Sequence, residues 1–104
     1  MNEQRLQSLR NFQYCGFEVP AHMHGAIDRY IEKGIPPGDF LIAVLKNDLS
    51  EACAAADLVN MHNIPGIVAW FYNHAPSSCY GSEKKLLEWI KIGGLQGEEN
   101  ALSN

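Results

Sequence analysis

A chain of 104 residues, of which 46% are hydrophobic and 19% charged, has the size and composition of a single globular domain. Its net charge of −4 argues against a general nucleic-acid binder, because such proteins need a basic surface. No apolar run approaches the roughly 20 residues of a membrane span, and the polar N-terminus lacks a signal-peptide core, so we expect a soluble intracellular protein with no membrane partner.

The first 18 residues are expected to form an N-terminal arm that includes a short helix. Pro20 suits the first turn of a second helix, which should run to about Lys33. The apolar face of this helix comprises Met23, Ala26, Ile27, Tyr30 and Ile31. Another face carries His22, Arg29 and Lys33 at positions i, i+7 and i+11. These three residues form either a solvated basic edge or a stripe that binds an anion.

The longest apolar run follows a rigid turn. Gly34 can end the second helix in the left-handed conformation, and Pro36 and Pro37 exclude helix through the turn. Asp39 is a suitable N-cap for the helix that follows. The core face predicted for a long helix over residues 39–59 comprises Leu41, Val44, Leu45, Leu49, Ala52, Ala56 and Val59.

Asp48 interrupts this apolar face, and two interpretations follow. A break at Asn47 and Asp48 would make Asp48 the N-cap of a second helix, with Glu51 completing a capping pair. A continuous helix would instead bury the carboxylate of Asp48, which would then need a cation such as Arg29. Because capping aspartates are far commoner than buried charges, the pattern favours the break.

Residues 58–64 have the character of a connector, and Pro65 lies near the start of the next helix, over about 64–75. Its predicted core face comprises Ile64, Ile67, Val68, Phe71 and Ala75, while Trp70, Tyr72 and His74 extend the apolar and aromatic surface around most of the circumference. Such a helix is either central in the core or part of an interface. We expect a homo-oligomer, most simply a dimer, because one small chain can hardly cover this helix on every side.

Pro76 ends that helix and begins a turn-rich loop. Ser82 is a plausible N-cap for a last helix, which Gly93 and Gly94 end. In this helix Leu86, Leu87 and Ile90 are expected to face inward, with Trp89 beside them. Every long apolar segment has helical spacing. The expected fold is therefore all-α, a compact bundle of four or five helices in a single domain, with an arm over residues 1–18, a helical domain over 19–94 and a disordered tail over 95–104.

The cysteines and histidines show no spacing typical of metal ligands, and no sequence motif of an enzyme family is present. The odd number of cysteines, three, fits reduced thiols. Cys79, on a loop before the start of a helix, is the only one placed to be reactive. We expect no catalytic activity, no cofactor and no metal.

Two segments resemble a family of small proteins from tailed phages and prophages: residues 30–57, YIEKGIPPGDFLIAVLKNDLSEACAAAD, and residues 70–82, WFYNHAPSSCYGS. Those proteins share a run like GIPPGxFLxAVLxNDLxxA and then a WxYNxAPSxxxGS segment. The resemblance covers about residues 19–92. It implies a phage accessory protein in the cytoplasm of the infected bacterial cell, but no particular activity. Counter-defence and host takeover are common roles of small phage proteins.

Two hypotheses about function follow. In the first, the chain binds a host protein through an aromatic and acidic surface, which the negative net charge favours. In the second, an oligomer forms a pocket that sequesters an anionic small molecule such as a nucleotide signal, because a basic stripe and a helix N-terminus can bind anions. A DNA-binding regulator is a weaker third option, since no basic recognition helix is present. The residues expected to contact a partner or ligand are His22, Arg29, Lys33, Trp70, Asn73, His74, Ser77, Ser78, Tyr80 and Ser82, with Trp70 or Tyr80 stacking on a base.

Overall fold

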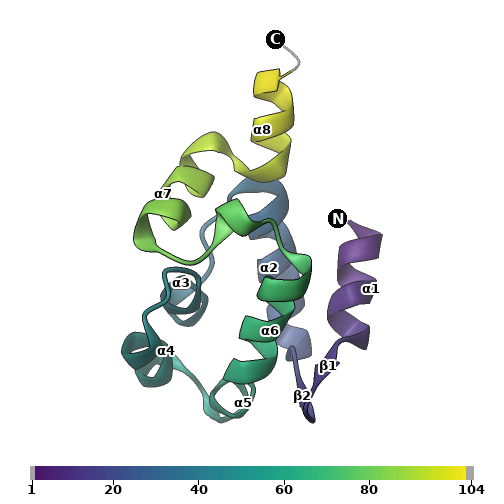
Figure 1. The fold of residues 1–104 in the computed structure, drawn as a ribbon, viewed down its shortest axis with the longest axis vertical. Helices are drawn as coiled ribbons and strands as arrows, with labels where there is room; N and C mark the ends of the chain where they lie inside the picture. Colours follow the sequence, from purple (N-terminus) through teal and green to yellow (C-terminus); the bar gives the residue numbers. More distant parts are fainter. Residues whose placement is uncertain (1, 103–104) are drawn as a thin grey trace.

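The computed structural model describes residues 2–102. This part of the chain contains eight α-helices, one short 3-10 helix and a two-stranded hairpin (Figure 1). In chain order the elements are α1 (Glu3–Asn11), β1 (Gln13–Tyr14), β2 (Phe17–Glu18), α2 (Ala21–Lys33), α3 (Asp39–Leu45), α4 (Leu49–Ala55), α5 (Leu58–His62), α6 (Ile64–His74), η1 (Ser77–Cys79), α7 (Glu83–Ile92) and α8 (Gly94–Leu102). The expected helical fold is confirmed, but four or five helices is too low a number.

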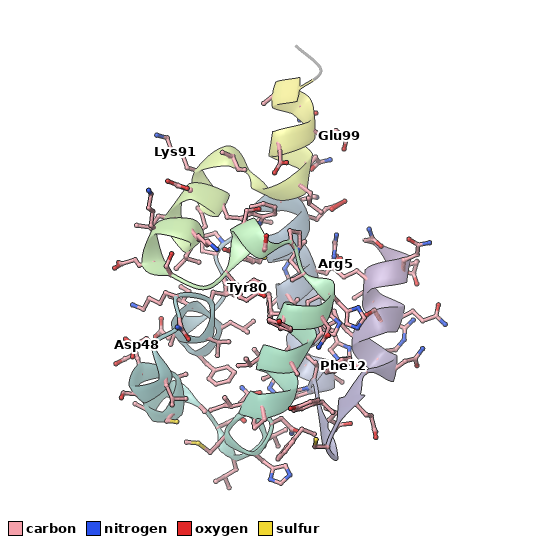
Figure 2. All side chains as sticks on the ribbon, in the orientation of Figure 1. Arg5, Phe12, Asp48, Tyr80, Lys91 and Glu99 are labelled. Carbon is pink, nitrogen blue, oxygen red and sulfur yellow. The ribbon has the colours of Figure 1, made fainter. Side chains whose placement is uncertain are left out.

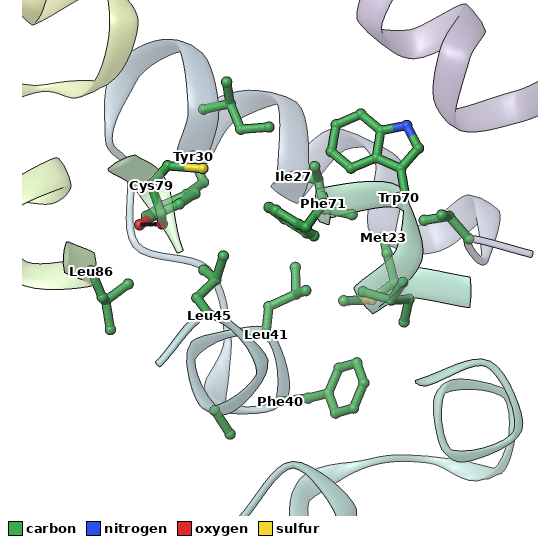
Figure 3. Packing of buried hydrophobic residues seen from close by; sticks show 14 of the residues in the cluster. Met23, Ile27, Tyr30, Phe40, Leu41, Leu45, Trp70, Phe71, Cys79 and Leu86 are labelled. Carbon is green, nitrogen blue, oxygen red and sulfur yellow. Dashed lines mark hydrogen bonds between the residues drawn. The ribbon is translucent and has the colours of Figure 1, made fainter. Parts of the chain in front are cut away.

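Helices α2 and α6 lie at the centre of the molecule, with α6 in front of α2 in Figure 1. Helix α1 and the hairpin lie on one side of this pair, α3 and α4 lie on the other, and α7 and α8 lie around the end of α2. The core fills the space where α2, α3 and α6 meet. Ile27, Leu41 and Phe71 come from these three helices, and each is almost completely buried (Figure 3). Burial of one such side chain contributes roughly 1.5–3 kcal/mol, so each of the three adds substantially to stability.

The long apolar stretch forms two helices because the chain turns at Asn47 and Asp48. Asn47 has a left-handed φ of 64°, which asparagine adopts more readily than most residues. Oδ1 of Asp48 accepts a hydrogen bond from the backbone N–H of Glu51 at 3.1 Å, so Asp48 is the N-cap of α4. The predicted break is therefore confirmed. It reorients the second segment, and Leu49, expected in the core, is 67% exposed.

Three helices account for the higher number: α1, which was expected only as part of the arm, and α5 and α8, which were not expected at all. The expected connector contains α5, a helix of five residues that Asp57 caps by accepting the N–H of Asn60 at 2.7 Å. Its residue Val59 is exposed, although the face pattern placed it in the core. Helix α8 occupies most of the segment that was expected to be a tail, and it packs on α2. The close approach requires glycine, since a Cβ on Gly94 would lie 2.5 Å from the backbone nitrogen of Gly34.

The ends of the helices follow the local sequence. Gly34 and Gly93 end α2 and α7 with left-handed φ values of 69° and 81°, as predicted. Oγ of Ser82 accepts the N–H of Lys85 at 3.2 Å and so caps α7, as predicted. The predicted cap of α3 is wrong by one residue. Gly38 is the N-cap, and Asp39 is the first helical residue, where its carboxylate interacts favourably with the helix dipole.

The buried faces of α6 and α7 differ from the prediction. Val68 and Leu87, expected in the core, are about half exposed, whereas Trp70 and Trp89 are completely buried. An indole ring buries more apolar area than a valine or leucine side chain, provided that its N–H finds an acceptor. Both rings meet this condition, because Trp70 donates to Oγ of Ser8 at 3.0 Å and Trp89 donates to a backbone carbonyl of α2 at 2.9 Å.

The hairpin was not expected, because its strands of two residues are too short to show an alternating pattern. Its turn places Cys15 and Gly16 at φ values of 51° and 82°, which is the combination of a type I′ turn. Strand β2 packs against α6 at Gly66, where a Cβ would lie 2.5 Å from the backbone oxygen of Glu18. Oδ1 of Asn63 also accepts the N–H of Glu18 at 3.0 Å. The hairpin therefore fixes the position of the N-terminal arm on the body of the protein.

Candidate binding surfaces

The three residues of the predicted basic stripe on α2, His22, Arg29 and Lys33, are all exposed, but they do not form one site. His22 lies near the start of the helix, where its Nε2 is 3.6 Å from Oδ2 of Asp57. Arg29 and Lys33 lie further along the helix and share an open hollow of about 310 Å³. The other residues that line this hollow are Asp28, Glu32 and Gln96. The half-buried carboxylate of Glu32 lines the same hollow and lowers the positive potential that an anion site needs.

A buried ion pair joins α1 to α2. Nη1 of Arg5 lies 2.9 Å from Oδ1 of Asp28 and 3.5 Å from Oε2 of Glu32. The side chain of Asp28 is 2% exposed and that of Arg5 is 11% exposed. A buried carboxylate paired with a cation thus exists at Asp28, whereas Asp48 is a cap on the opposite side of the molecule from Arg5 (Figure 2). The sequence contained one sign of this buried carboxylate, because Asp28 lies among the apolar residues of α2.

Two aromatic residues expected to contact a ligand instead attach α1 to α6. The ring of Trp70 is completely buried and its N–H donates to Oγ of Ser8, so this ring is not accessible for stacking on a base. The ring of His74 packs edge-on against Phe12, with 5.5 Å between the ring centroids. Trp70 therefore has a structural role, whereas His74 is exposed and remains a candidate for contact with a partner or ligand.

The polar residues at the end of α6 and in the loop between α6 and α7 are spread over several surfaces. Ser82 is the cap of α7, and the backbone oxygen of Ser77 accepts a hydrogen bond from a lysine of α7 at 3.2 Å. Tyr80 is half-buried against an aromatic ring of the core. Asn73 and Ser78 are exposed and line different hollows. None of the five lines the hollow that holds the two basic residues of α2.

The prediction that Cys79 is placed to react is wrong. The 3-10 helix turns its side chain into the core, where burial raises the pKa of the thiol to about 12. The nucleophilic thiolate is therefore scarce at neutral pH. The backbone oxygen of Cys79 accepts a 2.6 Å hydrogen bond from the hydroxyl of Tyr30, whose pKa is also raised by burial (Figure 3). Cys15 is exposed, Cys53 is half-buried, and within residues 2–102 no three His, Cys, Asp or Glu side chains are placed to hold a metal ion.

An exposed apolar surface runs along the outer side of α6. It comprises Pro65, Val68 and Tyr72 of α6, Tyr14 of β1 and Leu49 of α4, and we call it the α6 face. Val68 is at its centre, because it lines three hollows, one shared with both tyrosines and another with Leu49. Tyr72 is 78% exposed. The helix carries no Asp, Glu, Lys or Arg, although the solvent face of a helix is normally charged.

A second exposed apolar group lies on α5 at one end of the molecule, and we call it the α5 tip (Figure 1). It comprises Leu58, Val59 and Met61. Leu58 is 90% exposed, the largest exposure among the big apolar side chains described here. The tip is bordered by Asp57 and by the ring of His62, whose centroid lies 5.6 Å from that of an aromatic ring of the hairpin.

No protein-family model, no curated protein and no solved structure matches this chain. Within the described residues, every helix is too short or too polar to cross a membrane. The two exposed apolar surfaces are therefore the features from which a function can be argued.

Proposed function

We propose that this chain is a phage accessory protein that acts in the infected bacterium by binding a host protein through the α5 tip. The exposure of Leu58 is the observation that carries the proposal. Single exposed leucines are common, but Leu58 stands beside Val59 and Met61, which are also exposed. A group of exposed apolar side chains with a polar rim is typical of a protein-binding site. The role in counter-defence or host takeover rests on the resemblance to phage proteins.

The rim of the α5 tip carries two carboxylates beside His22 and His62, and the carboxylates indicate the chemistry of the partner. Asp57 precedes the tip, and Glu18 lies next to it, because its N–H bonds to the residue that follows α5. Both side chains are exposed, and the whole chain has a net charge of −4. Such a rim attracts basic surfaces and repels acidic ones. We expect a host protein with an apolar pocket for Leu58 and with lysine or arginine around it.

The alternative is an oligomer that sequesters an anionic small molecule, and it has weaker support. Its expected basic residues, Arg29 and Lys33, share their hollow with two carboxylates, and its expected stacking residue Trp70 is buried. Titration calorimetry with a panel of nucleotides tests this alternative directly. Saturable binding that Arg29→Ala abolishes would favour sequestration over host-protein binding.

Affinity capture from a lysate of the host bacterium tests the proposed function. Wild-type chain, Leu58→Asp and Leu87→Asp serve as baits, and Leu87→Asp is the matched control because Leu87 is an exposed leucine of α7. We expect a host protein that wild type and Leu87→Asp retain and that Leu58→Asp loses. Circular dichroism checks that each bait is folded, which we expect because both leucines already face water. Equal capture by all three baits would contradict a role for the α5 tip.

A further inference from the structure

The α6 face is unusual for this protein because it is uncharged. Within residues 2–102, Asp48 alone is charged among the residues that line the three hollows around Val68, and its carboxylate caps α4. The chain as a whole carries 12 acidic and 8 basic residues, so two copies repel each other at long range. A face without charge removes this repulsion at the point of contact. The pattern thus favours a second copy as the occupant over a partner selected by charge.

The shape of the face is complementary to itself. Pro65, Val68 and Tyr72 follow one another at i, i+3 and i+7, so they form one line along α6. If two α6 helices pack antiparallel and cross at Val68, each Val68 meets its counterpart, and each Tyr72 lies over Pro65 of the other copy. An open hollow of about 540 Å³, which these three residues line together with Tyr14, can receive the projecting ring of Tyr72 from the other copy.

The exposed area is sufficient for a reversible dimer. Tyr72 and Tyr14 are 78% and 48% exposed, and together they offer about 250 Å², since a tyrosine presents roughly 150–250 Å². Leu49, Val68 and Pro65 bring the apolar area to the order of 500 Å² per copy, against about 800 Å² per partner in a standard interface. We infer that the α6 face joins two copies of this chain in an antiparallel, two-fold dimer, with a dissociation constant on the order of micromolar.

A charge exchange at Val68 tests this arrangement. In the two-fold dimer each residue 68 faces its own counterpart, so Val68→Asp alone and Val68→Lys alone each place like charges together. Sedimentation velocity should show wild type approaching twice 11.6 kDa as its concentration rises. Each variant alone should have a dissociation constant at least about thirtyfold higher, the loss expected at a central contact. An equal mixture of the two variants should recover the dimer, because opposite charges then meet.

Three results would overturn the inference. The first is a wild-type chain that stays monomeric at all concentrations up to about 200 µM, well above the micromolar range expected here. The others are a dimer that Val68→Asp leaves intact and a mixture of the two charged variants that fails to form the dimer. Leu87→Asp is again the control and should dimerise as wild type does. Val68 is half exposed, and circular dichroism verifies that each variant is folded. Tyr72→Ala is a second, uncharged variant, and it should weaken the dimer by a similar factor.

The dimer and the proposed host-protein binding can fail independently. Leu58→Asp should lose the host protein but keep the dimer, whereas Val68→Asp should lose the dimer but still capture the host protein. A wild-type monomer whose capture of a host protein is abolished by Val68→Asp would mean that a host protein, not a second copy, occupies the α6 face.

Discussion

Helix α1 is held on α2 by the ion pair of Arg5 and Asp28, and we predict that Arg5→Leu will lower the free energy of unfolding by about 3 kcal/mol. Leucine keeps part of the apolar volume of the arginine side chain but leaves the carboxylate of Asp28 buried without a cation. Removing one partner of a buried ion pair costs roughly 3–5 kcal/mol.

The detachment of α1 limits this loss, because Asp28 regains water once the helix leaves. Detachment gives up at least the burial of Leu9, about 1.5–3 kcal/mol, and the hydrogen bond between Ser8 and Trp70, about 1 kcal/mol, in addition to the partial burial of Leu6 and Phe12. The first two contributions together are close to the lower end of the cost of an unpaired buried charge. We therefore expect a loss near 3 kcal/mol and not near 5.

Urea unfolding followed by circular dichroism measures the effect. A double-mutant cycle combines Arg5→Leu with Asp28→Leu. The loss of unfolding free energy in the double variant should be smaller than the sum of the two single losses by at least about 1 kcal/mol. Tryptophan fluorescence is a second signal, because one of the two indoles, that of Trp70, contacts Ser8 of α1. The exposed Arg10 of the same helix is the control, and Arg10→Leu should change stability by less than about 0.5 kcal/mol. A loss below about 1 kcal/mol for Arg5→Leu, or additivity in the cycle, would refute the reasoning.

Four further predictions concern individual residues. In urea unfolding, Asp48→Asn should leave the free energy of unfolding nearly unchanged, because asparagine also caps helices, whereas Asp48→Ala should lower it by about 1 kcal/mol. Equal losses for the two variants would argue against a cap. Gly66→Ala should cost about 1–3 kcal/mol, since its Cβ would meet the backbone oxygen of Glu18, and a neutral result would show that the hairpin moves away freely. The pKa of Cys79 is raised from 9.0 to about 12, so its contribution to stability should be complete below pH 9 and be lost as pH rises towards 12, at up to about 1.4 kcal/mol per pH unit. Because burial also raises the pKa of Tyr30, Cys79→Ala should reduce this slope without removing it. With a thiol reagent at pH 8, Cys15 should react at once and Cys79 only after unfolding; immediate reaction of both would contradict the burial.

The features that sequence analysis predicted well depend on local chemistry. Gly34 ends a helix because only glycine adopts its φ of 69° without strain, and Ser82 begins one because its hydroxyl accepts a nearby N–H. Asp48 belongs to the same class, since its cap needs only the backbone three residues later. Such interactions lie within one turn of the chain and can be read from a few neighbouring residues.

The features that it missed depend on competition between distant segments. Whether Val68 or Trp70 faces the core is decided by α1, which supplies Ser8 as the acceptor for the indole N–H. The pairing of Arg5 with Asp28 likewise joins two helices whose contact no local pattern encodes. For the same reason the candidate site residues were individually plausible, but the structure distributes them over separate surfaces.

The attachment of α1 also has a consequence for the synthesis of the protein. Arg5 finds its partner 23 residues later in the chain, and Ser8 finds its partner 62 residues later. A helix of nine residues does not persist alone in water. A ribosome adds about 5–20 residues each second, so roughly 3–12 seconds pass between the synthesis of Ser8 and that of Trp70. During this interval the first segment of the nascent chain exposes Leu9, and chaperones can reach it before the body of the protein does.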